Sequence, residues 1–576
     1  MLQGNFISRL FFILMTFLVI TVTSCEKDKD NTDFNGNDSI PIDNVIDTLT
    51  GLGHEESGDY SWDPQSEIVI NLQGSSISSS SPDVLVSGTI ATIRKSGNYK
   101  INGLLNSGAI IVDASKNDLV RLILDNVNIH NPTGPAILIE KARKVIVHLP
   151  EGSENQLSDG SVYYNHEDPN ATLFSKSDLT LYGTGKLTVN ANFNDGITGK
   201  DGLIIKSGIY NVNAIDDGIR GKDYLIIQQA DISVVTGGDG FKSDEETNPK
   251  PGNIVFTESK INAITGGDGI SAEGSIAINK GYYSIISGGG YETDTSSLSQ
   301  KGIKAGNLVV LSPDSVTIDA TDHAIDTDGS AEIRSGKFVL YTARTGVHTN
   351  KDIVVSGGSI NILRSVEGFE SNRMFISQAE IRITSIDDCF SATAGYDVDY
   401  DDGSLVEINS GYLVLDCING DGIDSNGDLT IAGGTIIIHG PHSAPEVTID
   451  PNGKFYINGG TIIGSGTNSD LIEFPDTTSH QNSLLAIFSN EYPKGTIIHL
   501  TNSKDDNIVT FKPSDEFQSI IFSSPGLVEG EIYRIFVEGS VEGNEKDGLF
   551  DGIYTQGVLI TEFTLTGKVT VLSNLS

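Results

Sequence analysis

Short apolar runs alternate with polar positions along most of the chain, and glycine-containing corners separate them. Runs such as Leu203-Ile204-Ile205 and Ile209-Tyr210-Asn211-Val212 have the length and alternation of β-strands. No stretch has a convincing helical period of 3.6 residues. The pattern therefore predicts an all-β protein.

A three-residue corner of the form acidic-Gly-apolar recurs along the chain. Asp195-Gly196-Ile197, Asp217-Gly218-Ile219 and Asp239-Gly240-Phe241 follow one another at intervals of 22 residues, and the apolar third residue is kept in every copy. The remaining copies are Asp268-Gly269-Ile270, Lys301-Gly302-Ile303, His323-Ala324-Ile325, Thr345-Gly346-Val347, Glu367-Gly368-Phe369, Asp388-Cys389-Phe390 and Asp421-Gly422-Ile423.

This period predicts the fold class: an all-β, right-handed parallel β-helix with coils of about 22 residues, each holding three short strands. We expect the apolar third residues to stack inward, and the corner glycines to supply a positive φ. Glycines such as Gly208 predict a second corner in mid-coil. The β-helix is predicted over residues 67–470, and a small all-β C-terminal cap or domain over 471–576.

The N-terminus has the features of an exported lipoprotein. Arg9 precedes an apolar run of about thirteen residues, too short to span a bilayer core of ~30 Å. Val22-Thr23-Ser24-Cys25 looks like a lipobox. We therefore expect a signal peptide over 1–24, lipidation of Cys25 and an acidic flexible tether over 25–66. The expected location is the outer membrane, with exposure at the cell surface.

The formal net charge is −40, which disfavours nucleic acid as a partner. An acidic polysaccharide would be repelled too, unless cations lie between the two. We expect a monomer. Besides Cys25 the chain has only Cys389 and Cys417, and the sequence does not decide whether they are oxidised.

The corner motif places one side chain per coil in register, and seven of the ten first positions are acidic. Stacked carboxylates about 5 Å apart repel one another unless cations separate them. Ca²⁺ suits such oxygen ligands, although Asp-Gly is also a favoured turn in its own right. Lys301, His323 and Thr345 interrupt the row. The predicted metal ligands are Asp195, Asp216, Asp217, Asp239, Asp268, Glu367, Asp387, Asp388 and Asp421.

Insertions at 245–251, 291–300 and 395–403 lie close to the corners in sequence. We expect all three to project near one edge, where loops of a solenoid commonly form a binding face.

Catalytic residues are harder to identify from the sequence. Asp387-Asp388 resembles the paired aspartates of polygalacturonases, but the Gly-His-Gly and Arg-x-Lys of that family are absent. A β-eliminating lyase needs a basic residue near the substrate. Arg220 and Lys242, each three residues after a corner aspartate, are the only candidates, and they could equally balance the acidic row.

Six segments of the sequence match a known family: Gly97–Gly103, Leu122–Val127, Leu187–Val189, Asn194–Ile197, Ile215–Ile219 and Phe522–Leu527 with Tyr533. On these segments the chain resembles bacterial secreted carbohydrate-binding domain-containing proteins with a pectate-lyase-like β-helix, over roughly residues 67–576. The resemblance implies calcium at the Asp-Gly-Ile corners and binding of polygalacturonate or a similar acidic plant-type polysaccharide. A polysaccharide lyase or polygalacturonase-like enzyme and an adhesin or structural surface rod remain alternatives.

Overall fold

The computed structural model describes residues 42–51, 53–164, 168–246, 251–293, 299–395, 400–555 and 557–576. They belong to one compact unit, Ile40–Ser576. These described residues are mostly β-strand, with one α-helix and one short 3₁₀ helix, Pro64–Ser66. The prediction of an all-β protein is confirmed.

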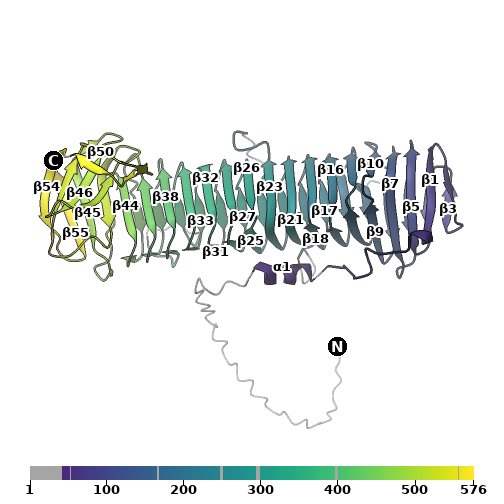
Figure 1. Ribbon diagram of the computed structural model, residues 1–576, viewed down its shortest axis with the longest axis horizontal. Coiled ribbons are helices and arrows are strands. Elements are labelled where there is room, and N and C mark those ends of the chain that lie inside the picture. The colour runs from purple at the N-terminus through teal and green to yellow at the C-terminus, as the bar shows by residue number, and fades with distance from the viewer. Residues whose placement is uncertain are drawn as a thin grey trace, which may run out of the picture. The chain divides into compact units, whose positions relative to one another are not determined.

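Parallel strands repeat in register along this unit. Ile197 of β14 (Asp195–Gly199) pairs with Ile219 of β17 (Ile219–Gly221), which pairs with Phe241 of β20 (Phe241–Ser243). The sequence interval between these partners is the 22 residues of the corner repeat. Each coil adds one strand to each of three rows, and Figure 1 shows the strands following one another from the purple to the green end.

One of the three rows is a 16-stranded sheet, which we call the corner sheet because the corner motifs lead into its strands. In order, its strands are β3 (Val84–Ser87), β4 (Ile90–Ile93), β6 (Ala109–Asp113), β8 (Ile137–Lys141), β11 (Ala171–Ser175), β14, β17, β20, β22 (Ile270–Ala272), β24 (Ile303–Ala305), β27 (Ile325–Thr327), β30 (Val347–Thr349), β33 (Phe369–Ser371), β36 (Phe390–Ala392), β39 (Ile423–Ser425) and β42 (Ile449–Pro451).

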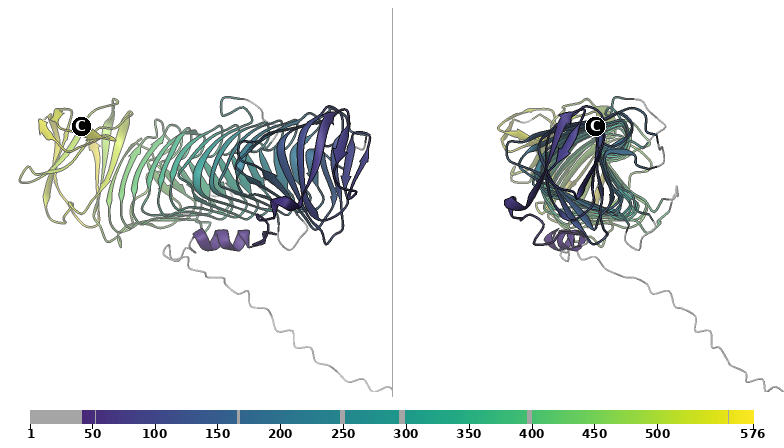
Figure 2. Two further views of the ribbon diagram at one scale, coloured as in Figure 1. Left: turned by 45° about the vertical axis from the view of Figure 1, so that its right-hand side comes forward. Right: turned by 90° about the vertical axis from the view of Figure 1, so that its right-hand side faces the viewer.

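The other two rows complete each coil. One runs through strands such as β18 (Tyr224–Gln228) and the first half of β21 (Asn253–Thr265) to β43 (Phe455–Ile457). The other runs through strands such as β19 (Ala230–Thr236) and the second half of β21 to β44 (Thr461–Gly466). The view along the stack in Figure 2 shows the coils enclosing one interior.

The apolar third residue of each corner lies in that interior. Ile219, Phe241 and Ile270 are fully buried and stack on one another through the corner sheet. Farther along, the rings of Phe369 and Phe390 stack with centroids 5.3 Å apart. One continuous apolar core therefore joins all the coils, because no coil can bury its inner face alone.

The corner glycines serve a different purpose from the one predicted. No corner glycine has a positive φ, whereas the mid-coil Gly208 and Gly411 have φ of 120° and 125°. A Cβ on Gly218 would lie 2.6 Å from the carbonyl oxygen of Gly240 in the next coil. Glycine is favoured at the corner because neighbouring coils approach closely there, and at mid-coil because of the backbone conformation.

Residues 42–66 differ from the predicted flexible tether. Helix α1 (Ile42–Thr50) packs Ile46 against Ile204 and Ile226 on the outside of the stack. The segment after it, which we call the strap (residues 53–63), continues along the coils, and Asp59 within it is 1% exposed. Apolar side chains of α1 pack against the coils, and charged side chains of the strap form ion pairs with them. This segment is therefore anchored to the coils.

The predicted signal peptide, residues 1–24, and the predicted lipidation site, Cys25, lie outside the described residues. In the described part of the chain, no helix is both long enough and apolar enough to cross a membrane.

Antiparallel strands end the stack on both sides. β1 (Glu67–Gly74) pairs antiparallel with β2 (Ile77–Ser79), and β44 pairs antiparallel with β48 (Phe517–Ser523). Beyond β44 a separate six-stranded sheet has its own apolar cluster, which includes Phe511 and Tyr533. Cys389 and Cys417 are free thiols buried in the core.

Candidate functional site

The corner sheet presents two rows of side chains. The corner row consists of the first residues of the ten corner motifs. The outer row consists of the residues three positions later, which lie between two inward-facing residues on each short strand and pair in register from coil to coil. The outer row comprises Thr198, Arg220, Lys242, Ser271, Lys304, Asp326, His348, Glu370, Ser391 and Asp424, and Asp450 extends it by one coil.

Corner aspartates hold neighbouring coils together. One carboxylate oxygen of Asp217 accepts the backbone N–H of Asp239 at 2.9 Å, and Asp239 accepts that of Asp268 at 2.8 Å. Asp388 likewise accepts the N–H of Asp421 at 2.6 Å. A corner aspartate therefore has a structural role that leaves its second oxygen available for another partner.

In the first acidic stretch, residues 195–268, cationic side chains take up that second oxygen. Lys242 lies 2.9 Å from Asp239 and 3.2 Å from Asp217. Arg220 pairs with Asp244 and lies 3.7 Å from Asp195. Protein cations already occupy the space where a metal ion would otherwise balance these carboxylates.

The two catalytic candidates, Arg220 and Lys242, are neighbours in register, as their spacing predicted. Asp217 and Asp239 raise the pKa of Lys242 well above its usual range, although burial acts against them. A lysine held in its charged form is poorly suited to act as a general base. Their geometry matches the alternative interpretation, in which they balance the acidic row.

A second stretch of the same face has no such compensation. We call Glu367, Asp388, Asp421, Asp424 and Asp450 the acidic block. Burial, together with neighbouring carboxylates, raises the pKa of Glu367 and Asp421 to about 9 and that of Asp424 to about 8. Oε2 of Glu367 is shielded from solvent and has no hydrogen-bond partner. No described lysine or arginine forms an ion pair with the block.

Sequence reasoning found the corner members of this block but missed Asp424 and Asp450, and it also missed Glu370 in the same row of side chains. Asp424 and Glu370 lie in the outer row, three positions after a corner residue, and Asp450 pairs with Asp424 in the next coil. The same spacing singled out Arg220 and Lys242, so it would have found Asp424 and Glu370 had it been applied to every coil. The prediction of the corner residues as calcium ligands stays a prediction.

The middle coils, where the acidic row is interrupted, bring histidines together. His323 belongs to the corner row, while Asp326 and His348 are successive members of the outer row. Among the described residues, they form the only group of three or more His, Cys, Asp or Glu side chains whose ligand atoms all lie within 4.8 Å of one another.

The insertions do not share one edge as predicted. Those at 245–251 and 395–403 follow β20 and β36, whereas that at 291–300 precedes β24. Two of the insertions therefore lie at the C-terminal ends of the corner-sheet strands, and the third lies at their N-terminal ends. Because the strands are parallel, these two sets of ends are on opposite sides of the corner sheet. Residues 247–250, 294–298 and 396–399 within them lie outside the described residues.

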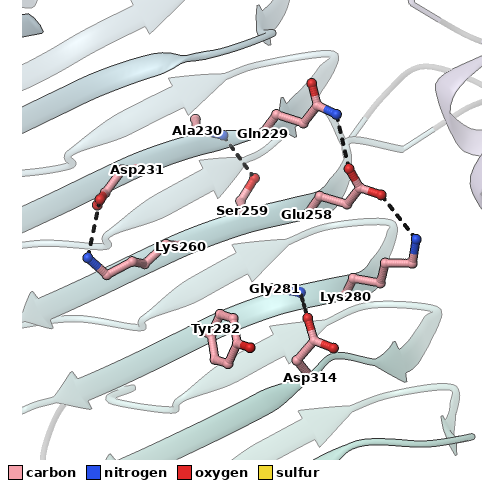
Figure 3. A pocket seen from close by; sticks show the side chains of 10 residues that line it. All are labelled: Gln229, Ala230, Asp231, Glu258, Ser259, Lys260, Lys280, Gly281, Tyr282 and Asp314. Carbon is pink, nitrogen blue, oxygen red and sulfur yellow. Dashed lines mark hydrogen bonds and ion pairs between the residues drawn. The ribbon is translucent and has the colours of Figure 1, made fainter. Parts of the chain in front are cut away.

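A hollow of about 340 Å³ lies over β19, β21 and β23 (Ser275–Ser287), away from the corner sheet (Figure 3). Tyr282 is 61% exposed there. Lys260 pairs with Asp231 at 3.2 Å, and Lys280 with Glu258 at 3.0 Å. The third carboxylate there, Asp314, accepts the backbone N–H of Gly281 at 2.8 Å. Each acidic side chain that lines the hollow therefore already has a partner within the protein.

Comparisons with known proteins find sequences that are similar to part of this chain. Residues 87–346, a little under half of the chain, match the model of a family described as carbohydrate-binding domain-containing protein. A protein of that description from Acetivibrio thermocellus is 38% identical over 176 residues, which are 29% of this chain and 60% of that protein. The chain therefore spans less than two thirds of this relative's length.

One solved structure is also similar: a gadolinium derivative of a polysaccharide lyase-like protein from C. thermocellum. It is 27% identical, has a TM-score of 0.34, and covers 48% of this chain and 96% of its own.

Proposed function

We propose that this protein is a Ca²⁺-dependent binder of acidic, pectin-like polysaccharide such as polygalacturonate, and that it is monomeric and lipid-anchored at the outer membrane. We infer that its coils form a right-handed parallel β-helix, since crossovers between parallel strands are almost always right-handed. The match of residues 87–346 to a carbohydrate-binding family supports a carbohydrate as the ligand.

The observation that carries the proposal is the acidic block. Its carboxylates lie on successive coils, whose spacing of ~4.8 Å makes adjacent negative charges repel strongly. Ca²⁺ takes six to eight oxygen ligands in flexible geometry, so it can bind between such coils. The unpartnered Oε2 of Glu367 and the second oxygen of Asp421 are ligands of the kind that it uses.

Charge also favours a cation between protein and polymer. A chain with a net charge of −40 repels a polyuronate, so direct contact between the two is unfavourable. Calcium held by the acidic block would keep coordination positions open to the carboxylates of the sugar. The same ion would then relieve repulsion within the protein and between the protein and its ligand.

Calorimetric titration of polygalacturonate into residues 40–576 tests this function, first with Ca²⁺ and then with a chelator. We expect binding that the chelator abolishes, without growth of the ultraviolet absorbance of unsaturated uronides. The Asp388→Asn/Asp421→Asn variant should bind about tenfold more weakly or worse, because two ligand charges are lost. Asp113→Asn removes an exposed carboxylate elsewhere and should bind as the wild type does.

The other outcomes separate the alternatives. If the absorbance of unsaturated uronides grows with time, the protein is a lyase. If new reducing ends form without that absorbance, the protein is a hydrolase. If the titration shows no binding and no product, the polyuronate proposal is overturned and the adhesin is favoured. Binding that persists in chelator would overturn its calcium dependence.

Membrane anchoring through Cys25 has a test of its own. In a bacterial host that processes lipoproteins, Cys25→Ala should move the protein from the membrane fraction to the soluble fraction, because the lipid can no longer attach. Ser24→Ala, which keeps a small residue before the cysteine, should leave the protein in the membrane fraction. Retention of Cys25→Ala in the membrane would contradict the anchor.

A further inference from the structure

The histidine cluster lies where the acidic row changes into other residues. His323 is the corner residue of its coil, and Asp326 and His348 pair directly in the register of β27 and β30. Nδ1 of His348 and Oδ1 of Asp326 are 2.6 Å apart. The imidazole rings of His323 and His348 stack with centroids 4.9 Å apart and an interplanar angle of 23°.

The partners of these side chains leave ligand atoms available. Nδ1 of His323 is shielded from solvent and has no hydrogen-bond partner. Lys301 approaches Oδ2 of Asp326 at 3.5 Å and so leaves Oδ1 on the side of His348. The hydrogen bond between His348 and Asp326 is the contact that an incoming cation would replace.

The chemistry of the three ligands differs from that of the acidic block. Imidazole nitrogens suit Zn²⁺ and neighbouring transition metals, whereas Ca²⁺ prefers an all-oxygen environment. Two histidines and one carboxylate are also the protein ligands of many sites that keep positions open for water or another molecule. The side chains are 14%, 14% and 25% exposed for His323, Asp326 and His348, so they are accessible from outside the coils.

We propose that His323, Asp326 and His348 form a binding site for a divalent transition-metal ion of the Zn²⁺ class, open to solvent on its outer side. The ion would connect two successive coils at the point where the corner row contains no carboxylate. The site is separate from the calcium-dependent function proposed above, since it uses other coils and other ligand atoms.

Lys301 gives the proposal a directional test. Its ammonium group lies within 3.5 Å of both Asp322 and Asp326 and opposes a second cation nearby. Lys301→Met should therefore strengthen metal binding several-fold, because it removes a like charge beside the site. If the cluster were only a network of ion pairs, this substitution would create no metal affinity.

The experiment is a titration of untagged residues 40–576 with Zn²⁺ against a chromophoric chelator, together with a Co²⁺ titration followed by visible absorption. We expect one saturable site, and Co²⁺ bands typical of low coordination number. His348→Ala and Asp326→Asn should weaken Zn²⁺ binding on the order of 100-fold, since even outer-shell partners of metal ligands contribute 10- to 100-fold. His480→Ala, at an exposed histidine away from the cluster, should leave binding unchanged.

Circular dichroism of each variant separates loss of a ligand from loss of fold, and Asp326→Asn keeps the size of the side chain if an alanine variant fails to fold. Absence of saturable Zn²⁺ binding to the wild-type protein would overturn the proposal. So would binding that survives both His348→Ala and Asp326→Asn. Neither result would bear on binding of polygalacturonate with calcium, so the two proposals fail separately.

Discussion

Asp59→Ala is expected to destabilise the protein by about 3–5 kcal/mol, because it removes the buried counter-charge of a buried lysine. The lysine then keeps only the exposed carboxylate of Glu56, at 3.8 Å. Oδ2 of Asp59 lies 2.8 Å from Nζ of Lys144, and both side chains are 1% exposed. Lys144 also donates a hydrogen bond to the backbone carbonyl of His54. The strap thus covers a charge on β9 (Lys144–Leu149) that would otherwise face water.

The measurement is the midpoint of urea or thermal unfolding of residues 40–576. Glu55→Ala in the same strap is the matched control: Glu55 pairs with Lys206 at 2.9 Å, and both side chains are about one-third exposed. An exposed pair of this kind contributes about 1 kcal/mol or less. Asp59→Leu/Lys144→Met should recover most of the stability, since it removes both charges. Equal small effects of Asp59→Ala and Glu55→Ala would contradict this account.

Stability in the absence of calcium is expected to fall as the pH rises from about 4 to about 9. Burial raises the pKa of Asp421 and Glu367 to about 9, so the folded protein keeps protons that the unfolded chain has already released. A state that binds more protons is favoured at low pH, and this contribution is lost as the pH rises through the folded pKa. Ca²⁺ binds the deprotonated form and should reverse the fall.

Asp421→Asn tests this directly at pH 8. The amide keeps an oxygen for the backbone N–H of Val447, which Asp421 accepts at 2.6 Å, but carries no charge. Without calcium the variant should therefore be more stable than the wild type by on the order of 2 kcal/mol. With calcium this advantage should shrink or disappear. Asp113→Asn, half-exposed and outside the block, should change stability by about 0.5 kcal/mol or less. A destabilised Asp421→Asn at pH 8 without calcium would contradict repulsion within the block.

Much of the candidate site follows from the spacing of a single motif. The corner repeat by itself predicts that Arg220 lies beside Lys242 and Asp388 next to Asp421, and both pairs are neighbours in the fold. The spacing could not tell which carboxylates would be neutralised. That depends on the ion pairs of Arg220 with Asp244 and of Lys242 with Asp217, which both join different coils.

The sequence by itself determined that the protein is all-β and that the apolar third residues face inward, because both follow from a local pattern repeated in every coil. Tertiary structure alone decided that residues 42–66 are anchored, since Asp59 finds Lys144 across 85 residues of sequence. It also decided why the corners need glycine, because a Cβ there would meet a carbonyl of the next coil. Contacts between segments far apart in sequence leave no periodic signal, and burial and charge pairing depend on them.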